Sequence, residues 1–343
     1  MKIILTGGGS AGHVTPNLAL IPHLKKHFNE IEYIGSKNGI EKDIVINTQI
    51  PYHEITTCKL NRSLTIKNLT LPFKLIKGIS EAKKILQNLK PNIVFSKGGF
   101  VSVPVVIAAH KLKIPIIAHE SDFSLGLANK IIYHFCKKMC FTFDNIPKKY
   151  LKKSIVTGPP IRKEIISKEK LSFNNNKKTI LVIGGSLGAK SINDFIFSNI
   201  KELTKSYNLI HIVGKNNINQ KFTKITNYKQ IDYTNNIGKL YNSCDLSISR
   251  AGSNTIFELL ALKIPMILIP LPKDSSRGDQ IENANYFEKN NYADVIKQDS
   301  LNINLLLNTI KSRLNKKIAT PLIKPLIANE KILKEIISSV NLP

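Results

Sequence analysis

The chain has 343 residues, enough for two ordinary domains that each bury a core of their own. Its longest apolar runs, such as 264–270, are strand-sized, which excludes a membrane span, and no leader precedes the first predicted strand, so we expect a protein that stays in the cytoplasm. The formal charge is +26, but only five residues are arginine, so the charge favours anionic partners such as phosphorylated substrates or an acidic membrane face and predicts no nucleic-acid partner.

The first predicted strand, 2–6, runs into the glycine-rich sequence GGGSAGHVTP at 7–16. Thr15 and Pro16 are typical of the N-cap and the first position of a helix, so we expect the first helix to begin there. Backbone N–H groups at a glycine turn before a helix suit a phosphate. His13 is the side chain of this stretch that can move a proton near neutral pH.

Short apolar strands alternate with amphipathic helices along the whole chain, which is typical of parallel sheets covered on both faces. We predict strands at 2–6, 31–34, 93–96, 115–119, 139–143, 155–157, 179–183, 208–213, 245–249 and 265–270. The segment 72–89 is a predicted helix that packs its apolar face on the sheet. The polar, asparagine-rich segment 168–178 is the predicted linker.

The two halves of the chain echo each other in two places. The sequence at 3–12 matches that at 180–189, and two later helices both run into Leu-Lys-Ile-Pro, at 112–115 and at 262–265. Two echoes in the same order predict two domains of one doubly wound type. Ligands of such sheets bind at the carboxyl ends of the strands, so we expect the loops of both domains to line one cleft.

The glycine spacing also fits an NAD-dependent oxidoreductase, but the strand 31–34 ends in Gly35-Ser36-Lys37 without the acid that such enzymes use for a ribose. No Asp-x-Asp occurs, so a sugar-nucleotide transferase built on this chain would stabilise its leaving group with helix dipoles, backbone amides and basic side chains, without a metal. The small residues of 249–254 open a helix that suits a diphosphate, and Glu258 follows one turn later. An ordinary helix with one surface acid is equally consistent with that stretch.

Seven motifs then fall in one order: GGxxGHVTP at the start, HE at 119–120, ANK at 128–130, TGPPIR at 157–162, GGSLGA at 184–189, SRAGSNTIFE at 249–258 and DQxxNA from 279. With them the chain resembles, from residue 1 to about residue 330, the bacterial UDP-N-acetylglucosamine:undecaprenyl-pyrophosphoryl-muramyl-pentapeptide N-acetylglucosaminyltransferases. Phe100 departs from the tyrosine of many relatives, and Ser121-Asp122 replaces their Gln-Asn. No role is therefore assigned to a hydroxyl or an amide at these positions, and the roles of His119 and Glu120 stay open.

The resemblance implies a GT-B fold, in which two Rossmann-like, doubly wound parallel-sheet domains face each other across a cleft. We expect an N-terminal domain at 1–165 on the acceptor and membrane side, a UDP-N-acetylglucosamine-binding domain at 166–324, and a terminal helix at 325–343 that crosses back to the first domain.

The implied reaction is inverting, metal-independent transfer of N-acetylglucosamine from UDP-N-acetylglucosamine to the muramyl 4-hydroxyl of lipid I, the undecaprenyl-linked acceptor. Lipid II and UDP are the products, in the peptidoglycan synthesis on which cell shape and division depend, and no cofactor is expected. The resemblance places such an enzyme peripherally on the cytoplasmic, anionic face of the cell membrane. The loop before residue 72 is a candidate for that contact because it mixes apolar and basic residues.

The resemblance also gives the candidate site residues their roles. His13 matches the catalytic base, and Ser10, Ala11 and Gly12 match the first substrate loop. Donor or acceptor contacts fall on the following residues: Asn129, Arg162, Ser186 for the diphosphate, Glu258 for the ribose and Gln280 for the sugar. A related GT-B enzyme with another lipid acceptor, such as diacylglycerol, is the alternative, and an NAD-dependent oxidoreductase is the remote one.

Overall fold

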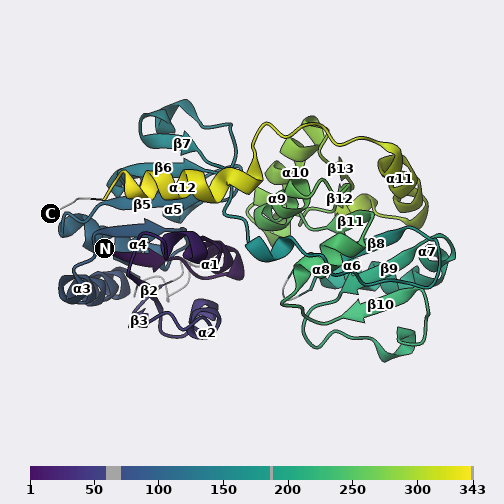
Figure 1. Cartoon of the computed structure of the whole chain (residues 1–343), viewed down its shortest axis with the longest axis horizontal. Coiled ribbons are helices and arrows are strands. Elements are labelled where there is room, and N and C mark those ends of the chain that lie inside the picture. The colour runs from purple at the N-terminus through teal and green to yellow at the C-terminus, as the bar shows by residue number, and fades with distance from the viewer. Residues whose placement is uncertain (59–70, 186–187, 341–343) are drawn as a thin grey trace. The chain divides into compact units, whose positions relative to one another are not determined.

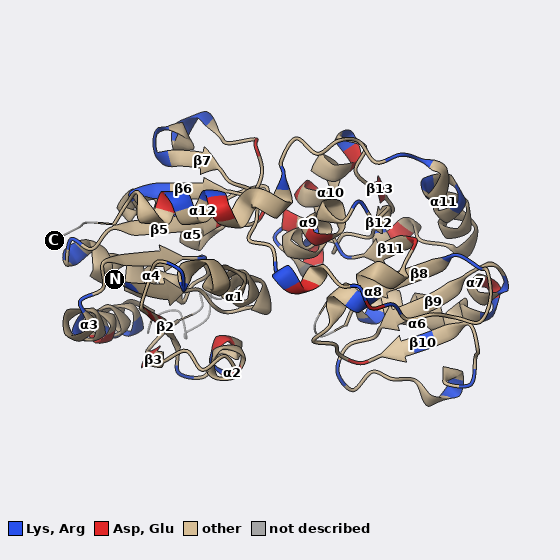
Figure 2. Ribbon diagram, in the orientation of Figure 1, with Lys and Arg blue, Asp and Glu red and all other residues tan. Residues whose placement is uncertain are grey.

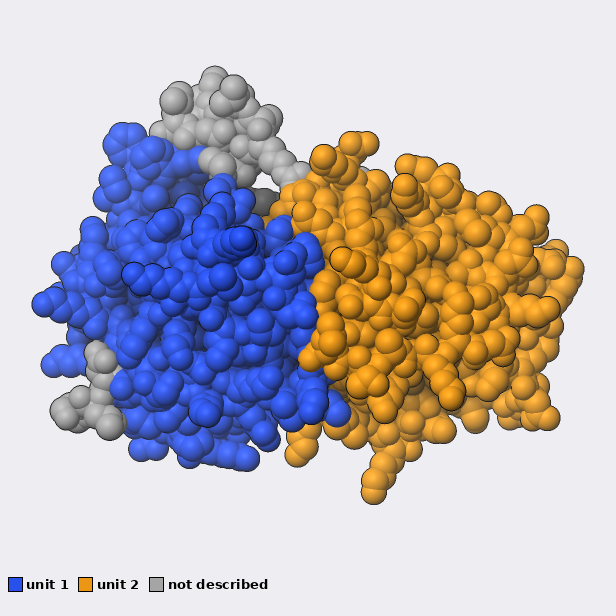
Figure 3. Space-filling view, turned by 90° about the horizontal axis from the view of Figure 1, so that it is seen from above, with its two compact units in different colours: residues 1–162, 323–343 blue, residues 163–322 orange. Residues whose placement is uncertain are grey.

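The structure is a computed structural model that describes residues 1–58, 71–185 and 188–340 (Figure 1). The chain divides into two compact units, residues 1–162 with 323–343 and residues 163–322 (Figure 3). Each unit contains one parallel sheet with helices on both faces, which confirms the predicted fold class. None of the described helices is long and apolar enough to cross a bilayer.

The first unit is built on a seven-stranded sheet in the order β3-β2-β1-β4-β5-β6-β7. Its strands are β1 (Lys2–Thr6), β2 (Glu30–Ser36), β3 (Tyr52–Ile55), β4 (Ile93–Ser96), β5 (Ile116–Glu120), β6 (Lys138–Phe141) and β7 (Ser154–Val156). Its helices are α1 (Ala11–Leu24), α2 (Ile40–Ile46), α3 (Leu71–Leu89), α4 (Ser102–Lys111), α5 (Leu127–Phe135) and α12 (Ala328–Ile337). Successive residues of a strand face opposite sides, so Ile4 packs with α3, α4 and α5, whereas Ile3 and Leu5 pack with α1, α2 and α12.

The second unit repeats this topology in a six-stranded sheet, β10-β9-β8-β11-β12-β13. Its strands are β8 (Thr179–Ile183), β9 (Asn208–Ile212), β10 (Tyr228–Ile231), β11 (Leu246–Ser249), β12 (Met266–Leu268) and β13 (Asp294–Val295). Its helices are α6 (Lys190–Ser198), α7 (Ile200–Ser206), α8 (Ile237–Ser243), α9 (Ser253–Ala261), α10 (Asp279–Lys289) and α11 (Ile303–Asn315). The strand order therefore changes direction between β1 and β4 in the first sheet and between β8 and β11 in the second. These are the topological switch points, where ligands of such sheets bind.

The internal repeat predicted from Leu-Lys-Ile-Pro is confirmed at the level of the backbone. Lys113 after α4 and Lys263 after α9 have left-handed φ angles of 57° and 55°. The isoleucine that follows each lysine donates its N–H to a carbonyl five residues earlier, at 3.0 Å in both units. The tetrapeptide is thus one helix-ending turn used twice.

Helix α1 begins at Ala11, so the prediction that it starts at Thr15 and Pro16 is wrong. The first N–H groups of a helix need no partner inside it, which lets the helix extend back into the glycine loop. Pro16 therefore lies inside the helix, and the Thr15 hydroxyl donates to the carbonyl of Ala11 at 3.0 Å. This shift places His13 in the first helical turn.

The polar segment 168–178, predicted to be the linker, is bonded into the second unit instead. The Leu171 amide donates to Ser243 Oγ at 2.7 Å, and the Asn175 side chain donates to those of Asn208 and Asn227 at 3.0 Å. The chain passes between the two units at residues 162 and 163. Asparagine side chains satisfied by one another give the same sequence pattern as a solvated linker.

Helices α3 and α12 differ in detail from the predictions, α3 in the packing of its apolar face and α12 in the residue at which it starts. On α3, Ala82 and Leu86 are buried, but Phe73 and Ile76 are 75% and 66% exposed, so the first turn of the stripe is unpacked. The loop before α3, a candidate for membrane contact, lies outside the described residues. The terminal helix α12 starts at Ala328 rather than at the predicted 325 and packs in the core of the first unit.

Candidate active site

The first glycine loop packs against the loop that follows β4, the neighbouring strand. A Cβ atom on Gly99, which has a φ of 80°, would overlap the carbonyl oxygen of Gly8 and lie 3.4 Å from Nδ1 of His13. A Cβ on Gly9 would overlap the ring of Phe100. Phe100 therefore acts as a packing surface for the glycine loop, a role for which its missing hydroxyl is irrelevant.

Ser10 and His13 form a pair at the start of α1. The Ser10 hydroxyl lies 2.8 Å from Nδ1 of His13, and the His13 amide donates to the Ser10 carbonyl at 3.1 Å. Ser10 is exposed and His13 is half-buried, with the predicted loop residues Ala11 and Gly12 between them. When Nδ1–H donates to the serine oxygen, Nε2 is the ring atom that accepts a proton, which is the arrangement a general base needs.

Glu41, in the first turn of α2, binds this loop and was not predicted from the sequence. Its carboxylate is fully buried and accepts hydrogen bonds from the amides of Gly9 and Ser36, both at 3.1 Å, and from the Ser36 hydroxyl. The amide of Gly9 is therefore bonded to a carboxylate of the same unit and does not face outward toward a phosphate. The sequence signal that could have identified it is an acidic residue five positions after the end of β2, whereas the sequence analysis looked for an acid at the strand end itself.

Lys97 and His119 form a buried pair at the ends of β4 and β5. His119 Nε2 donates to the carbonyl of Gly158 at 3.0 Å, so its Nδ1 accepts from Lys97 Nζ at 2.9 Å, and Lys97 also bonds Ser121 Oγ. Burial lowers the pKa of Lys97 to about 8 and holds the pKa of His119 well below its ordinary value. Lys97 thus joins the loops after β4 and β5 through His119 and Ser121.

Asn129 and Glu120 fix the loop between β5 and α5. The buried Asn129 amide nitrogen donates to Glu120 Oε2 at 2.9 Å and to the His119 carbonyl at 3.2 Å, and Glu120 also accepts from the amide of Gly126. Asn129 Oδ1 is buried and has no partner among the described residues. A Cβ on Gly98 would lie 2.7 Å from this oxygen, so Asn129 and His13 flank the same glycine pair.

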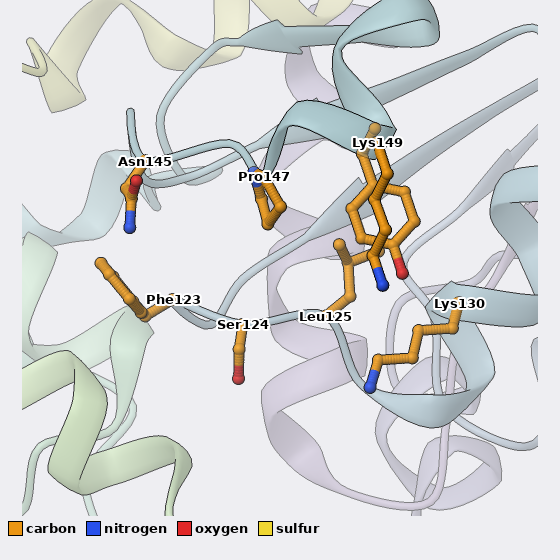
Figure 4. A pocket seen from close by; sticks show the side chains of 8 residues that line it. Phe123, Ser124, Leu125, Lys130, Asn145, Pro147 and Lys149 are labelled. Carbon is orange, nitrogen blue, oxygen red and sulfur yellow. The ribbon is translucent and has the colours of Figure 1, made fainter.

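A cavity of about 210 Å³ lies at the same edge of the first sheet (Figure 4). It is lined by residues of the loops after β5 and β6 and of the helices that follow them: Phe123, Ser124, Leu125, Lys130, Asn145, Pro147, Lys149 and Tyr150. Sites that enclose a drug-sized ligand measure roughly 300–1,000 Å³. The cavity is therefore too small for a nucleotide.

Arg162, also predicted to contact substrate, is half-buried where the chain leaves this unit.

In the second unit, open space lies in front of the first turn of α9. A Cβ on Gly252, the N-cap of α9, or on Gly185, in the loop after β8, would meet nothing within 4 Å. The helix N-terminus presents backbone N–H groups and the positive end of its dipole there, as an anion site requires. Ser186, predicted to bind the diphosphate, lies outside the described residues.

Glu258 lies in α9 and Gln280 at the start of α10, two helices that touch where the rings of Phe257 and Phe287 meet edge to face at 5.1 Å. Glu258 is buried and accepts a hydrogen bond from Tyr241 Oη at 2.9 Å, a partner the sequence did not reveal. Gln280 Oε1 accepts from the Leu271 amide at 3.1 Å, which fixes the loop before α10.

Arg250, at the end of β11, makes its hydrogen bonds inside the second unit. Its guanidinium donates to the carbonyls of Ile269 and Pro270 at 3.0 and 3.2 Å and to the side chains of Ser191 and Gln298, both at 2.7 Å. Burial lowers its pKa. Arg250 therefore ties the ends of β11 and β12 to α6.

Two family models match the chain, the glycosyltransferase family 28 N-terminal domain over residues 3–141 and the glycosyltransferase family 28 C-terminal domain over residues 179–338. The chain is 53% identical over 318 residues to the UDP-N-acetylglucosamine–N-acetylmuramyl-(pentapeptide) pyrophosphoryl-undecaprenol N-acetylglucosamine transferase of Clostridium botulinum (strain Alaska E43 / Type E3), covering 90% of this chain and 88% of that protein. The protein of the same name from Clostridium kluyveri is 52% identical over 318 residues, covering 90% of each chain.

The fold is similar to the crystal structure of Acinetobacter baumannii MurG, with a TM-score of 0.73 over 98% of this chain and 99% of that chain. At 24% sequence identity this likeness concerns the fold, which is the GT-B arrangement of two Rossmann-like domains.

Proposed function

The chain belongs to glycosyltransferase family 28 and, within it, to the transferases that its curated relatives represent, and we propose on this basis how its residues carry out the reaction. The observation that carries the function is 53% identity over 90% of the chain to an enzyme of this name. The reaction is transfer of N-acetylglucosamine from UDP-N-acetylglucosamine to the N-acetylmuramyl-(pentapeptide) group of a pyrophosphoryl-undecaprenol lipid. It forms lipid II for peptidoglycan.

The second unit is the proposed donor site. The N-terminus of α9 suits the diphosphate of UDP because the helix dipole favours an anion there and because there is space beside Gly252, its N-cap. Glu258 accepts hydrogen bonds from the ribose, Gln280 Nε2 donates to the sugar, and Ser186 contacts the diphosphate. Support for these roles is the position of Glu258 in α9 and of Gln280 at the start of α10.

The first unit is the proposed acceptor site, with His13 as the general base. The muramyl 4-hydroxyl attacks C1 of N-acetylglucosamine, the bond from C1 to the UDP oxygen breaks, and His13 Nε2 takes the hydroxyl proton. One displacement at an α-linked donor gives a β-linked product. Ser10 fixes the ring of His13. Ala11, Gly12, Asn129 and Arg162 border the substrate, and UDP leaves without a metal ion.

Peripheral binding to the cytoplasmic face of the cell membrane is proposed from the start of α3. Phe73 and Ile76 are exposed there, and Lys74 and Lys77 alternate with them. Apolar side chains that enter the headgroup region among lysines that meet anionic lipids are typical of interfacial helices. Lysines and arginines occur over both units (Figure 2). Because few of these residues are arginine, we propose no nucleic-acid partner.

The function is tested by transfer of labelled N-acetylglucosamine to lipid I, with diacylglycerol as the competing acceptor and with or without a chelator. We expect labelled lipid II both with and without the chelator. Label found only on diacylglycerol would identify a different lipid acceptor. Activity lost on chelation would contradict the metal-free mechanism. Thermal stabilisation by NAD rather than by UDP would favour the oxidoreductase.

A further inference from the structure

Glu41 places a negative charge inside the glycine loop of the first unit. It lies in the first turn of α2, is fully buried, and accepts hydrogen bonds from Gly9 and Ser36. A buried carboxylate is costly unless donors surround it, and hydrogen bonds to a charged group are stronger than neutral ones. The contacts of Glu41 therefore hold the loop more firmly than an ordinary turn would be held.

The space around the carboxylate is closed by glycine backbone. A Cβ on Gly8 would lie 2.6 Å from Cδ of Glu41 and 2.8 Å from each of its oxygens, and a Cβ on Gly39 would overlap the same group. The carboxylate is thus packed against the backbone of Gly8 and Gly39 and accepts from the Gly9 amide, a donor of the kind that a phosphate would use. The Gly9 amide is therefore already bonded within the unit and is not a donor for a phosphate of donor or acceptor.

The same contact leads directly to the proposed base. Gly9 has a φ of 84° and is exposed, and its amide is held by Glu41. The next residue, Ser10, is also exposed, and its hydroxyl meets His13 Nδ1 at 2.8 Å. The hydrogen bond from Gly9 to Glu41 therefore fixes the backbone from which Ser10 reaches His13.

We propose that Glu41 is a positioning residue for His13, an internal anion that replaces phosphate in the first glycine loop and sets the Ser10–His13 pair. The proposal rests on the proposed function and deepens it, because it assigns the phosphates of the acceptor to groups other than the Gly9 amide. Glu41 touches no substrate. It acts through Gly9 and Ser10.

The first test compares Glu41→Ala and Glu41→Gln with Glu81→Ala. Glu81 is a matched control, since it also accepts from a backbone amide and a hydroxyl, both of Thr56, away from the glycine loop. We expect Glu41→Ala to lower kcat per folded molecule at least tenfold, with the KM for UDP-N-acetylglucosamine unchanged and with partial recovery in formate. Glu41→Gln keeps the shape of the side chain, and its kcat should lie between those of Glu41→Ala and the wild type. If Glu41→Ala does not fold, Glu41→Gln is the variant that decides the test. An unchanged kcat in both Glu41 variants would overturn the proposal.

The second test is a double-mutant cycle between Glu41→Gln and Ser10→Ala. If Glu41 acts through Ser10, adding Ser10→Ala to Glu41→Gln should lower kcat little further. The effects of substitutions at residues coupled in one network do not add. Additive losses would overturn the route through Ser10.

A readout without turnover keeps this proposal separate from the function. Nitrogen-15 shifts of the His13 ring report which nitrogen carries the proton. We expect an Nδ1–H ring in the wild type and a mixture of tautomers in Glu41→Gln. The same tautomer in both proteins would overturn the proposal, even if the wild type proved inactive on lipid I.

Discussion

The Ser10 hydroxyl lies 2.8 Å from Nδ1 of His13, inside the first turn of α1. A histidine serves as a base only when one ring nitrogen is unprotonated and aimed at the substrate, and the partner of the other nitrogen decides which one that is. The Ser10 oxygen is such a partner. In the proposed mechanism this oxygen accepts from Nδ1–H, which leaves Nε2 to act as base.

Replacing Ser10 by alanine should lower kcat about tenfold, because one hydrogen bond contributes roughly 1–1.5 kcal/mol and 1.4 kcal/mol corresponds to a factor of ten in rate. The affinity for UDP-N-acetylglucosamine should not change. Ser10→Thr, which keeps the hydroxyl, is the control and should retain most activity. Steady-state kinetics with lipid I measure both effects, and a Ser10→Ala enzyme as fast as the wild type would separate Ser10 from the mechanism.

Replacing Glu258 by alanine should weaken binding of UDP-N-acetylglucosamine by about tenfold or more, because hydrogen bonds to a charged group contribute roughly 1.5–3 kcal/mol. Tyr241→Phe is the matched control, since it removes the hydrogen bond at 2.9 Å to Glu258 and keeps the carboxylate. We expect that variant to bind the donor within a few-fold of the wild type. Isothermal calorimetry measures both variants, and equal donor affinity in Glu258→Ala and the wild type would exclude the ribose contact.

Replacing Phe73 and Ile76 together by serine should weaken binding to anionic vesicles about tenfold or more, since burying one such side chain contributes roughly 1.5–3 kcal/mol. Leu322→Ser, which removes a side chain that is 68% exposed in the second unit, is the control. Vesicle sedimentation measures the partition. Unchanged binding of the double variant, with the control unaffected, would show that α3 does not touch the membrane.

His211 makes the second unit sensitive to acid. Its ring lies between Tyr228 Oη at 2.8 Å and Asn193 Oδ1 at 3.0 Å, and burial lowers its pKa to about 3. Between that value and the ordinary pKa of about 6.5 only the unfolded chain binds the proton, so the free energy of unfolding falls as pH falls, by about 1.4 kcal/mol per pH unit. Hydrogen exchange of the β9 amides from pH 7 to pH 5 measures this slope. His211→Gln should flatten the slope and the exposed His27→Gln should not, and an unchanged slope in His211→Gln would contradict the assignment.

The sequence predicted the inner strands of both sheets but not all of their edges. β3, β10 and β13 escaped prediction, and each stands at the edge of its sheet with the sequence YHEI, YKQI or DV. An edge strand has one neighbour and more contact with water, so it needs fewer apolar residues and lacks the pattern that marks an inner strand. The doubled topology was predictable because Leu-Lys-Ile-Pro ends a helix in both units.

The site was predictable where a motif names a residue and not where a partner arrives from elsewhere in the chain. His13 and Ser10 are close in sequence, so their pairing follows once α1 starts at Ala11. Glu41 reaches Gly9 across 32 residues, and Tyr241 reaches Glu258 across 17. These contacts depend on how α2 and α8 pack, which no local pattern contains.

The most direct measurement of the account is the rate at which His13→Ala transfers N-acetylglucosamine to lipid I, with donor affinity determined on the same preparation. A lost general base costs roughly 10²–10⁴ in rate, so we predict a fall of that size in kcat with the Kd for UDP-N-acetylglucosamine unchanged. Transfer by His13→Ala at a rate close to that of the wild type would contradict the assignment of His13 as the base.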